Sequence, residues 1–121
     1  MLTGNSHSYP KKMQKTEIDE AAQLLQLHGV FDQEALAKAP ELSEASLRQL
    51  LTRQVLYLLE RDFERLMQSL YRIDVPEHRF KECLVSDDPA GQIADLMLKR
   101  ELMKVQTRRW YASRSRAASE S

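Results

Sequence analysis

One carboxylate, that of Asp62, lies inside a long apolar stripe of the sequence. The stripe extends from Ser43 to about Ile73 and repeats at the three- and four-residue spacing of an α-helix. Its apolar members are Leu47, Leu50, Leu51, Val55, Leu58, Leu59, Phe63, Leu66, Met67 and Leu70. An unpaired charge is costly to bury, so Asp62 needs a partner. Arg100 holds the matching place in a second apolar arc, and we predict that the two residues form an ion pair between helices.

The same two residues allow a second interpretation, a small-ligand site. In that site Arg100 would bind an anion, and Asp62 would orient the anion or act as a base. His28 and Tyr71 are the further candidates for such a site. Ion-pair networks also perturb pKa values without any function, so we favour the structural interpretation of the pair.

Histidine and cysteine are too sparse for a metal centre or an activated nucleophile. His28 lies on the inner face of the first predicted helix, near its end, where a hydrogen-bonded structural histidine is expected. His78 and Cys83 are five positions apart and have no companions at metal-ligand spacing. The chain also has no Gly-rich phosphate loop, nucleophile elbow or HExxH motif. We therefore predict no metal, no cofactor and no catalytic residue, so that the protein is not an enzyme.

The C-terminal region combines basic and aromatic residues. Residues 99–116 contain seven basic residues and one acid. A nucleic acid could contact Lys104, Arg108, Arg109 and Trp110 there, because cations bind phosphates and aromatic rings stack on bases. Cations are also favoured near a helix C-terminus, however, and aromatic rings anchor last turns to a core. The chain has no net charge, so nucleic-acid binding is the alternative and not the leading hypothesis.

Composition indicates an ordinary soluble helical protein of 121 residues, with 42% apolar and 30% charged residues. Residues 17–64 contain ten acids and four bases. The front half of the chain is therefore acidic, whereas the C-terminal stretch is basic. The two regions can attract each other within one chain or between copies. The single cysteine favours a reducing compartment, and the N-terminus lacks the apolar core of a signal peptide. We expect a cytoplasmic protein that does not enter a membrane.

The pattern predicts an all-α fold, a small helical bundle. A flexible arm (1–15) precedes a single helical domain (16–111), and a disordered tail (112–121) follows it. Helices are expected from Thr16 to Gly29, from Asp32 to Ala39, from Ser43 to Ile73, from His78 to Val85 and from Ala90 to about Tyr111. The long central helix, a rod of about 45 Å, should pack antiparallel to the long C-terminal helix.

Several short runs in the second half of the chain, namely Leu70 to Asp74, Ile93 to Leu96, Arg100 and Thr107-Arg108, resemble small all-helical bacterial proteins that have no assigned activity. The resemblance implies a bacterial cytoplasmic helical domain, and it implies no catalytic residues.

The leading functional hypothesis is a non-enzymatic interaction or assembly protein that self-associates through its helices. The overlong central rod and the broad apolar girth of the last helix suggest a homodimer. The alternative is a nucleic-acid-associated protein that uses the basic C-terminal helix and tail, and the third hypothesis is the ligand site around Asp62 and Arg100. The pathway and any other protein partner are not encoded in these patterns.

Overall fold

The computed structural model describes residues 14–39 and 41–120, with side chains placed to residue 115. All regular structure in these ranges is helical, which confirms the predicted all-α class. The helices are α1 (Lys15–Leu27), α2 (Gln33–Lys38), α3 (Glu44–Arg61), α4 (Phe63–Ile73), α5 (Glu77–Leu84) and α6 (Pro89–Glu120). No helix in the described part of the chain combines the length and hydropathy needed to cross a bilayer.

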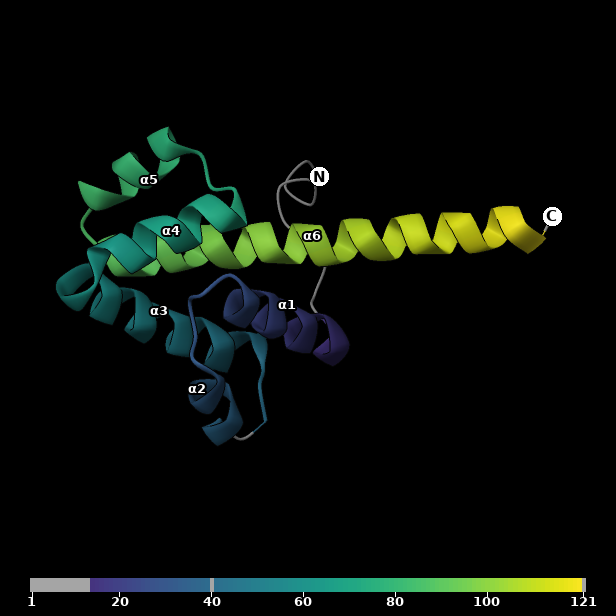
Figure 1. Ribbon diagram of the computed structural model, residues 1–121, viewed down its shortest axis with the longest axis horizontal. Helices are drawn as coiled ribbons and strands as arrows, with labels where there is room; N and C mark the ends of the chain where they lie inside the picture. The colour runs from purple at the N-terminus through teal and green to yellow at the C-terminus, as the bar shows by residue number, and fades with distance from the viewer. Residues whose placement is uncertain (1–13, 40, 121) are drawn as a thin grey trace, which may run out of the picture.

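Helix α6 is the axis of the fold, and α1, α3, α4 and α5 all contact it (Figure 1). Helix α3 runs antiparallel to it on one side, as predicted, and α4 and α5 lie on the other side. The buried face of α6 consists of Ala90, Ile93, Ala94, Met97, Leu98, Glu101, Leu102 and Val105. Apolar residues cover much of the circumference of this helix because four helices of the same chain pack against it, and a second copy is not needed to explain them.

The predicted central rod is wrong, because the chain bends at Asp62 and forms two helices. Asp62 has φ −152° and ψ 66°, outside helical geometry, and its Oδ1 accepts a hydrogen bond from the backbone N–H of Arg65 at 3.2 Å. A short acidic side chain competes in this way with the helical hydrogen bonds of the backbone. The bend lets Leu58 and Leu66, one on each helix, reach the same core.

Other helix ends follow their local signals. Gly29, at φ +90°, ends α1 in a Schellman motif, in which the N–H of Val30 bonds to the carbonyl of Leu25 at 2.9 Å. Ser43 caps α3 by accepting a hydrogen bond from Ser46 N–H at 3.1 Å. The first helix, however, begins at Lys15, and its N-terminal cap is Gln14, two residues before the expected cap at Thr16.

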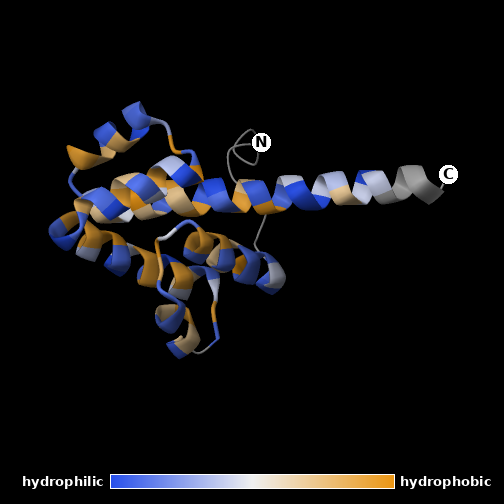
Figure 2. Cartoon of the chain, viewed as in Figure 1, coloured by the Kyte–Doolittle hydropathy of each residue, from blue (hydrophilic) through white to orange (hydrophobic). Residues whose placement is uncertain are grey.

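Helix α6 continues to Glu120 and does not end near Tyr111. The tail expected to be disordered is thus helical from 112 to 120, while residue 121 and most of the expected flexible arm, residues 1–13, lie outside the described residues. Figure 1 shows that the last turns of α6 project beyond the other helices. Figure 2 shows that the packed part of α6 carries its apolar residues, whereas the projecting part is largely hydrophilic.

Candidate functional site

The predicted ion pair between Asp62 and Arg100 is wrong. Asp62 is exposed at the bend between α3 and α4, where it caps α4. Arg100 instead donates from Nη2 to Oδ2 of Asp74 at 3.1 Å. Asp74 ends α4 in the left-handed conformation, at φ 73°, and this geometry turns its carboxylate towards α6. The pair therefore joins α6 to the end of α4.

The structure does not assemble the ligand site that was considered around these residues. Asp62 lies at the bend, Tyr71 is exposed on α4, and His28 follows the end of α1. Arg100 lines a hollow of about 330 Å³, whose other lining residues are Met103, Lys104, Thr107 and Arg108. No carboxylate or imidazole from the proposed set shares this hollow.

A buried polar cluster, formed by His28, Glu101 and Lys104, lies instead where α1 meets α6. Glu101 has no exposed side-chain surface, and its Oε2 lies 2.6 Å from Nδ1 of His28. Lys104 places Nζ 3.5 Å from Oε1 of Glu101 and donates to the carbonyl of Ile73 at 2.6 Å. The cluster thus ties together the end of α1, the end of α4 and the middle of α6.

The buried role of Glu101 was missed in the sequence, whereas the hydrogen-bonded role predicted for His28 is confirmed. A signal for Glu101 was present: it lies four residues after Met97 and four before Val105, at the centre of the buried face of α6. A carboxylate at that spacing is buried and therefore needs a partner, as was expected for Asp62. Arg100, one position earlier, lies at the edge of that face.

The cluster is arranged to support the fold. A carboxylate can orient an imidazole for acid–base work, but such a pair also needs a nucleophile and a pocket. Neither His28 nor Glu101 lines the hollows described for this surface. Burial raises the pKa of the Cys83 thiol, which keeps it protonated and unreactive. The described residues include no group of three His, Cys, Asp or Glu side chains that could hold a metal ion.

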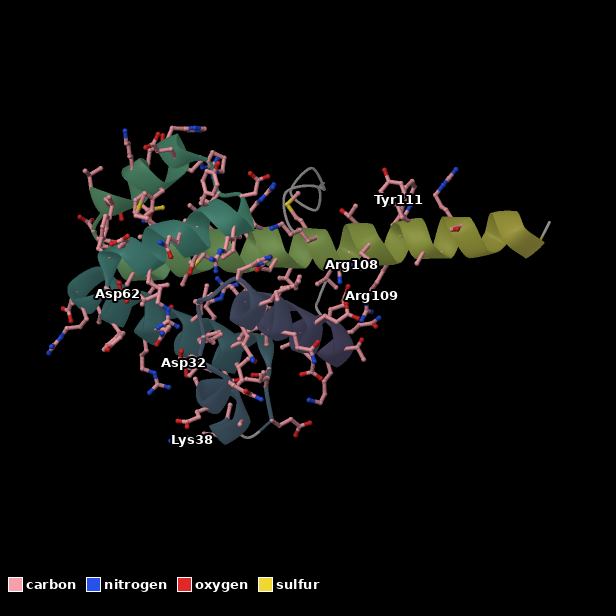
Figure 3. All side chains as sticks on the ribbon, viewed as in Figure 1. Asp32, Lys38, Asp62, Arg108, Arg109 and Tyr111 are labelled. Atoms are coloured by element: carbon pink, nitrogen blue, oxygen red, sulfur yellow. The ribbon has the colours of Figure 1, made fainter. Side chains whose placement is uncertain are left out.

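Much of the basic stretch is used within the chain. Lys104 belongs to the buried cluster, and Lys99 pairs with Asp95 at 2.9 Å. Arg109 binds Glu20 of α1 through Nη2 at 3.0 Å, and this hydrogen bond raises the pKa of the guanidinium. The candidate nucleic-acid contacts therefore do not form one patch. Figure 3 shows Arg109 on the α1 side of α6, with Tyr111 on the other side.

The exposed residues of α6 opposite its buried face form a second surface, which we call the outer stripe. It consists of Met103, Thr107, Trp110, Tyr111 and Arg114. Their spacing of three and four residues places them along one face of the helix. Trp110 and Tyr111 are 53% and 63% exposed and contact each other edge to face, with centroids 4.9 Å apart. The guanidinium of Arg114 lies 4.9 Å from the centre of the Trp110 ring.

A groove of about 310 Å³ lies between α4 and α5. Its apolar lining comes from Met67, Leu70, Val75 and Phe80, and its rim carries Tyr71, Asp74 and Glu77. The rim residues are exposed, with the side chains of Asp74 and Glu77 at 82% and 72%. The groove therefore presents an apolar floor beside two carboxylates.

Comparisons with known proteins identify no relative. No family model, no curated protein and no solved structure matches this chain. Function is therefore inferred from the surfaces of the molecule itself.

Proposed function

We propose that this protein is a non-enzymatic assembly protein that self-associates through the outer stripe of α6. The observation that carries the proposal is the projection of α6 past the other helices, with Trp110 and Tyr111 exposed on it. The part of α6 that follows Val105, the last buried residue among those described, is too short to be a stable helix in water on its own, because most helical stability in proteins comes from packing. A partner helix or groove would supply that packing.

Aromatic side chains are the residues that most often anchor protein interfaces. Trp110 and Tyr111 offer large apolar surfaces with few rotatable bonds, and Arg114 extends the same stripe. A second copy of the chain is the proposed partner. The exposed aromatic rings, and not net charge, are the proposed source of affinity, because Lys99, Lys104 and Arg109 are already engaged within the chain. We place this homodimer in the bacterial cytoplasm, in keeping with its lone cysteine.

Nucleic-acid binding is the second candidate, and it is supported by exposed arginines around the exposed indole. Arg108 and Arg114 are exposed on either side of Trp110 in the sequence. It is the weaker candidate because Lys99, Lys104 and Arg109 are engaged by groups of the same chain. Binding to phosphates would weaken steeply with added salt.

The test is the mass of the full-length protein, measured by light scattering over a roughly hundredfold range of concentration. We expect a concentration-dependent dimer that the double variant Trp110→Ala/Tyr111→Ala converts to a monomer. The matched control is Val85→Ala, which removes an exposed apolar side chain from the end of α5 and should leave the dimer intact. Far-ultraviolet circular dichroism checks that each variant remains helical.

A wild-type protein that stays monomeric throughout would overturn the proposal. If the Trp110→Ala/Tyr111→Ala variant still forms the dimer, the outer stripe is not the dimer interface. The same measurement with a short duplex DNA at two salt concentrations separates the second candidate. A complex that forms only at low salt and is lost in Arg108→Glu would favour nucleic-acid binding.

A further inference from the structure

We infer that the groove between α4 and α5 receives the outer stripe of α6 from a second copy of the chain. This inference rests on the proposed self-association and assigns the surface that the stripe would occupy. The groove supplies what the stripe lacks, a hollow of about 310 Å³ whose floor is formed by the edges of three core residues, Leu70, Val75 and Phe80. The indole of Trp110 and the phenol ring of Tyr111 are the groups that would fill it.

The charges of the two surfaces are complementary. Arg114 belongs to the stripe, and Glu77 stands on the groove rim beside Asp74, which is already paired with Arg100 of its own chain. Glu77 has only a weak partner in its own chain, since its Oε1 lies 3.9 Å from Nζ of Lys81 and both side chains are largely exposed. Glu77 can therefore accept a guanidinium from a partner without giving up a strong contact. Arg114 would be shared between the Trp110 ring and this carboxylate.

The occupant must come from another copy. Helix α6 is held against α1 by the Arg109–Glu20 pair, and its last turns project beyond α4 and α5 (Figure 1). A straight helix cannot bring its own outer stripe back to α4 and α5. Two copies related by a twofold axis each offer one stripe and one groove, so the pair makes the contact twice and closes.

The test is a charge exchange across the predicted contact, in the full-length protein. Glu77→Arg and Arg114→Glu should each weaken the dimer about tenfold or more, as measured by sedimentation equilibrium. The double variant Glu77→Arg/Arg114→Glu should recover an affinity within about threefold of the wild type, because the charges again match. The matched control is Glu82→Arg, at a residue of the same helix with 73% exposure that lies outside this groove.

Mixing supplies an independent readout. Trp110→Ala/Tyr111→Ala lacks the stripe but keeps the groove, whereas Glu77→Arg keeps the stripe and has an altered groove. Together they should form a heterodimer with one intact contact, at a concentration where each variant alone is largely monomeric. If Glu77→Arg behaves like Glu82→Arg, or the double variant does not recover, the groove assignment is overturned. Self-association that still depends on Trp110 and Tyr111 would then leave the proposed function standing, whereas a monomeric wild type would remove both.

Discussion

Among single residues, Glu101 carries the greatest energetic weight, because its carboxylate has no exposed surface. Oε2 is hydrogen-bonded to His28, while Oε1 has no hydrogen-bond partner and only the ammonium of Lys104 at 3.5 Å. A buried carboxylate needs compensation from neighbouring cations and donors. The cluster therefore makes the junction of α1 and α6 specific, since a shift of either helix would separate His28 from Glu101.

We expect Glu101→Ala to lower the free energy of unfolding by about 3 kcal/mol, because it removes the partner of the partly buried His28 and Lys104 side chains and leaves a cavity. Glu101→Gln keeps the shape and one hydrogen bond, and should cost about 1–2 kcal/mol. Urea denaturation followed by circular dichroism measures both values. The exposed change Glu60→Ala is the control and should stay within about 0.5 kcal/mol of the wild type. Equal stability of Glu101→Ala and the wild type would contradict a supporting role.

Among the elements, the bend between α3 and α4 has the largest consequence for the fold. Asp62 is the last residue before α4 and supplies its N-terminal cap. The bend replaces one rod of about 45 Å by two shorter helices whose apolar faces reach the same core. The groove between α4 and α5 forms at the next corner, where Asp74 and Val75 connect the two helices.

The capping role of Asp62 predicts a specific pattern of substitutions. Asp62→Ala should cost about 1 kcal/mol, because the N–H of Arg65 loses its acceptor, whereas Asp62→Asn should stay within about 0.5 kcal/mol of the wild type. Thermal and urea unfolding of the two variants distinguish them. A loss of several kcal/mol in Asp62→Asn would instead indicate a buried ion pair and revive the pairing with Arg100.

For the whole molecule, opposite charges hold the elements of one chain together. Asp95 of α6 bonds to Arg48 of α3 and also to Lys99, Arg109 joins α6 to α1, and Arg100 joins it to Asp74. Among these pairs, Arg109 with Glu20 joins the basic C-terminal stretch to the acidic front half. What remains for a partner is the outer stripe and the projecting end.

The α3–α6 contact predicts how global stability depends on pH. Burial opposes ionisation of Asp95, but the hydrogen bonds from Lys99 and Arg48 outweigh it and lower the pKa of the carboxyl. A lowered folded-state pKa stabilises the protein above the unfolded value, near about 3.9, and this contribution is lost as the pH falls through the folded-state pKa. Asp95→Asn should cost about 1 kcal/mol near neutral pH, because the partly exposed pair is screened by solvent.

Urea midpoints of Asp95→Asn and the wild type, measured from pH 7 down to about pH 2, check this expectation. The difference between the two proteins should shrink in acid, because protonation removes the same charge that the substitution removes. A difference that stays constant down to the lowest pH would assign the effect to packing and not to the ion pairs.

Most of the helical architecture could be predicted because its signals are local. Gly29, Ser43 and Asp88 mark helix boundaries by backbone conformation or by capping, and each acts within a few residues of its own position. The buried faces of α1 and α3 likewise follow from periodicity. The bend at Asp62 was missed because the same residue suits both a buried ion pair and a cap, and apolar spacing continues through it.

The sequence alone determined the all-α class, most helix boundaries and the apolar faces, since these depend on spacing and short-range hydrogen bonding. Only the tertiary structure decided which charges meet, because His28 and Glu101 are separated by 73 positions and Arg100 and Asp74 by 26. Such pairs depend on the rotation and the offset of packed helices, and a rotation of one position exchanges Arg100 for Glu101 on the buried face. The rotation and offset of the helices also determine the outer stripe and the groove, because these are surfaces that the packed helices leave uncovered.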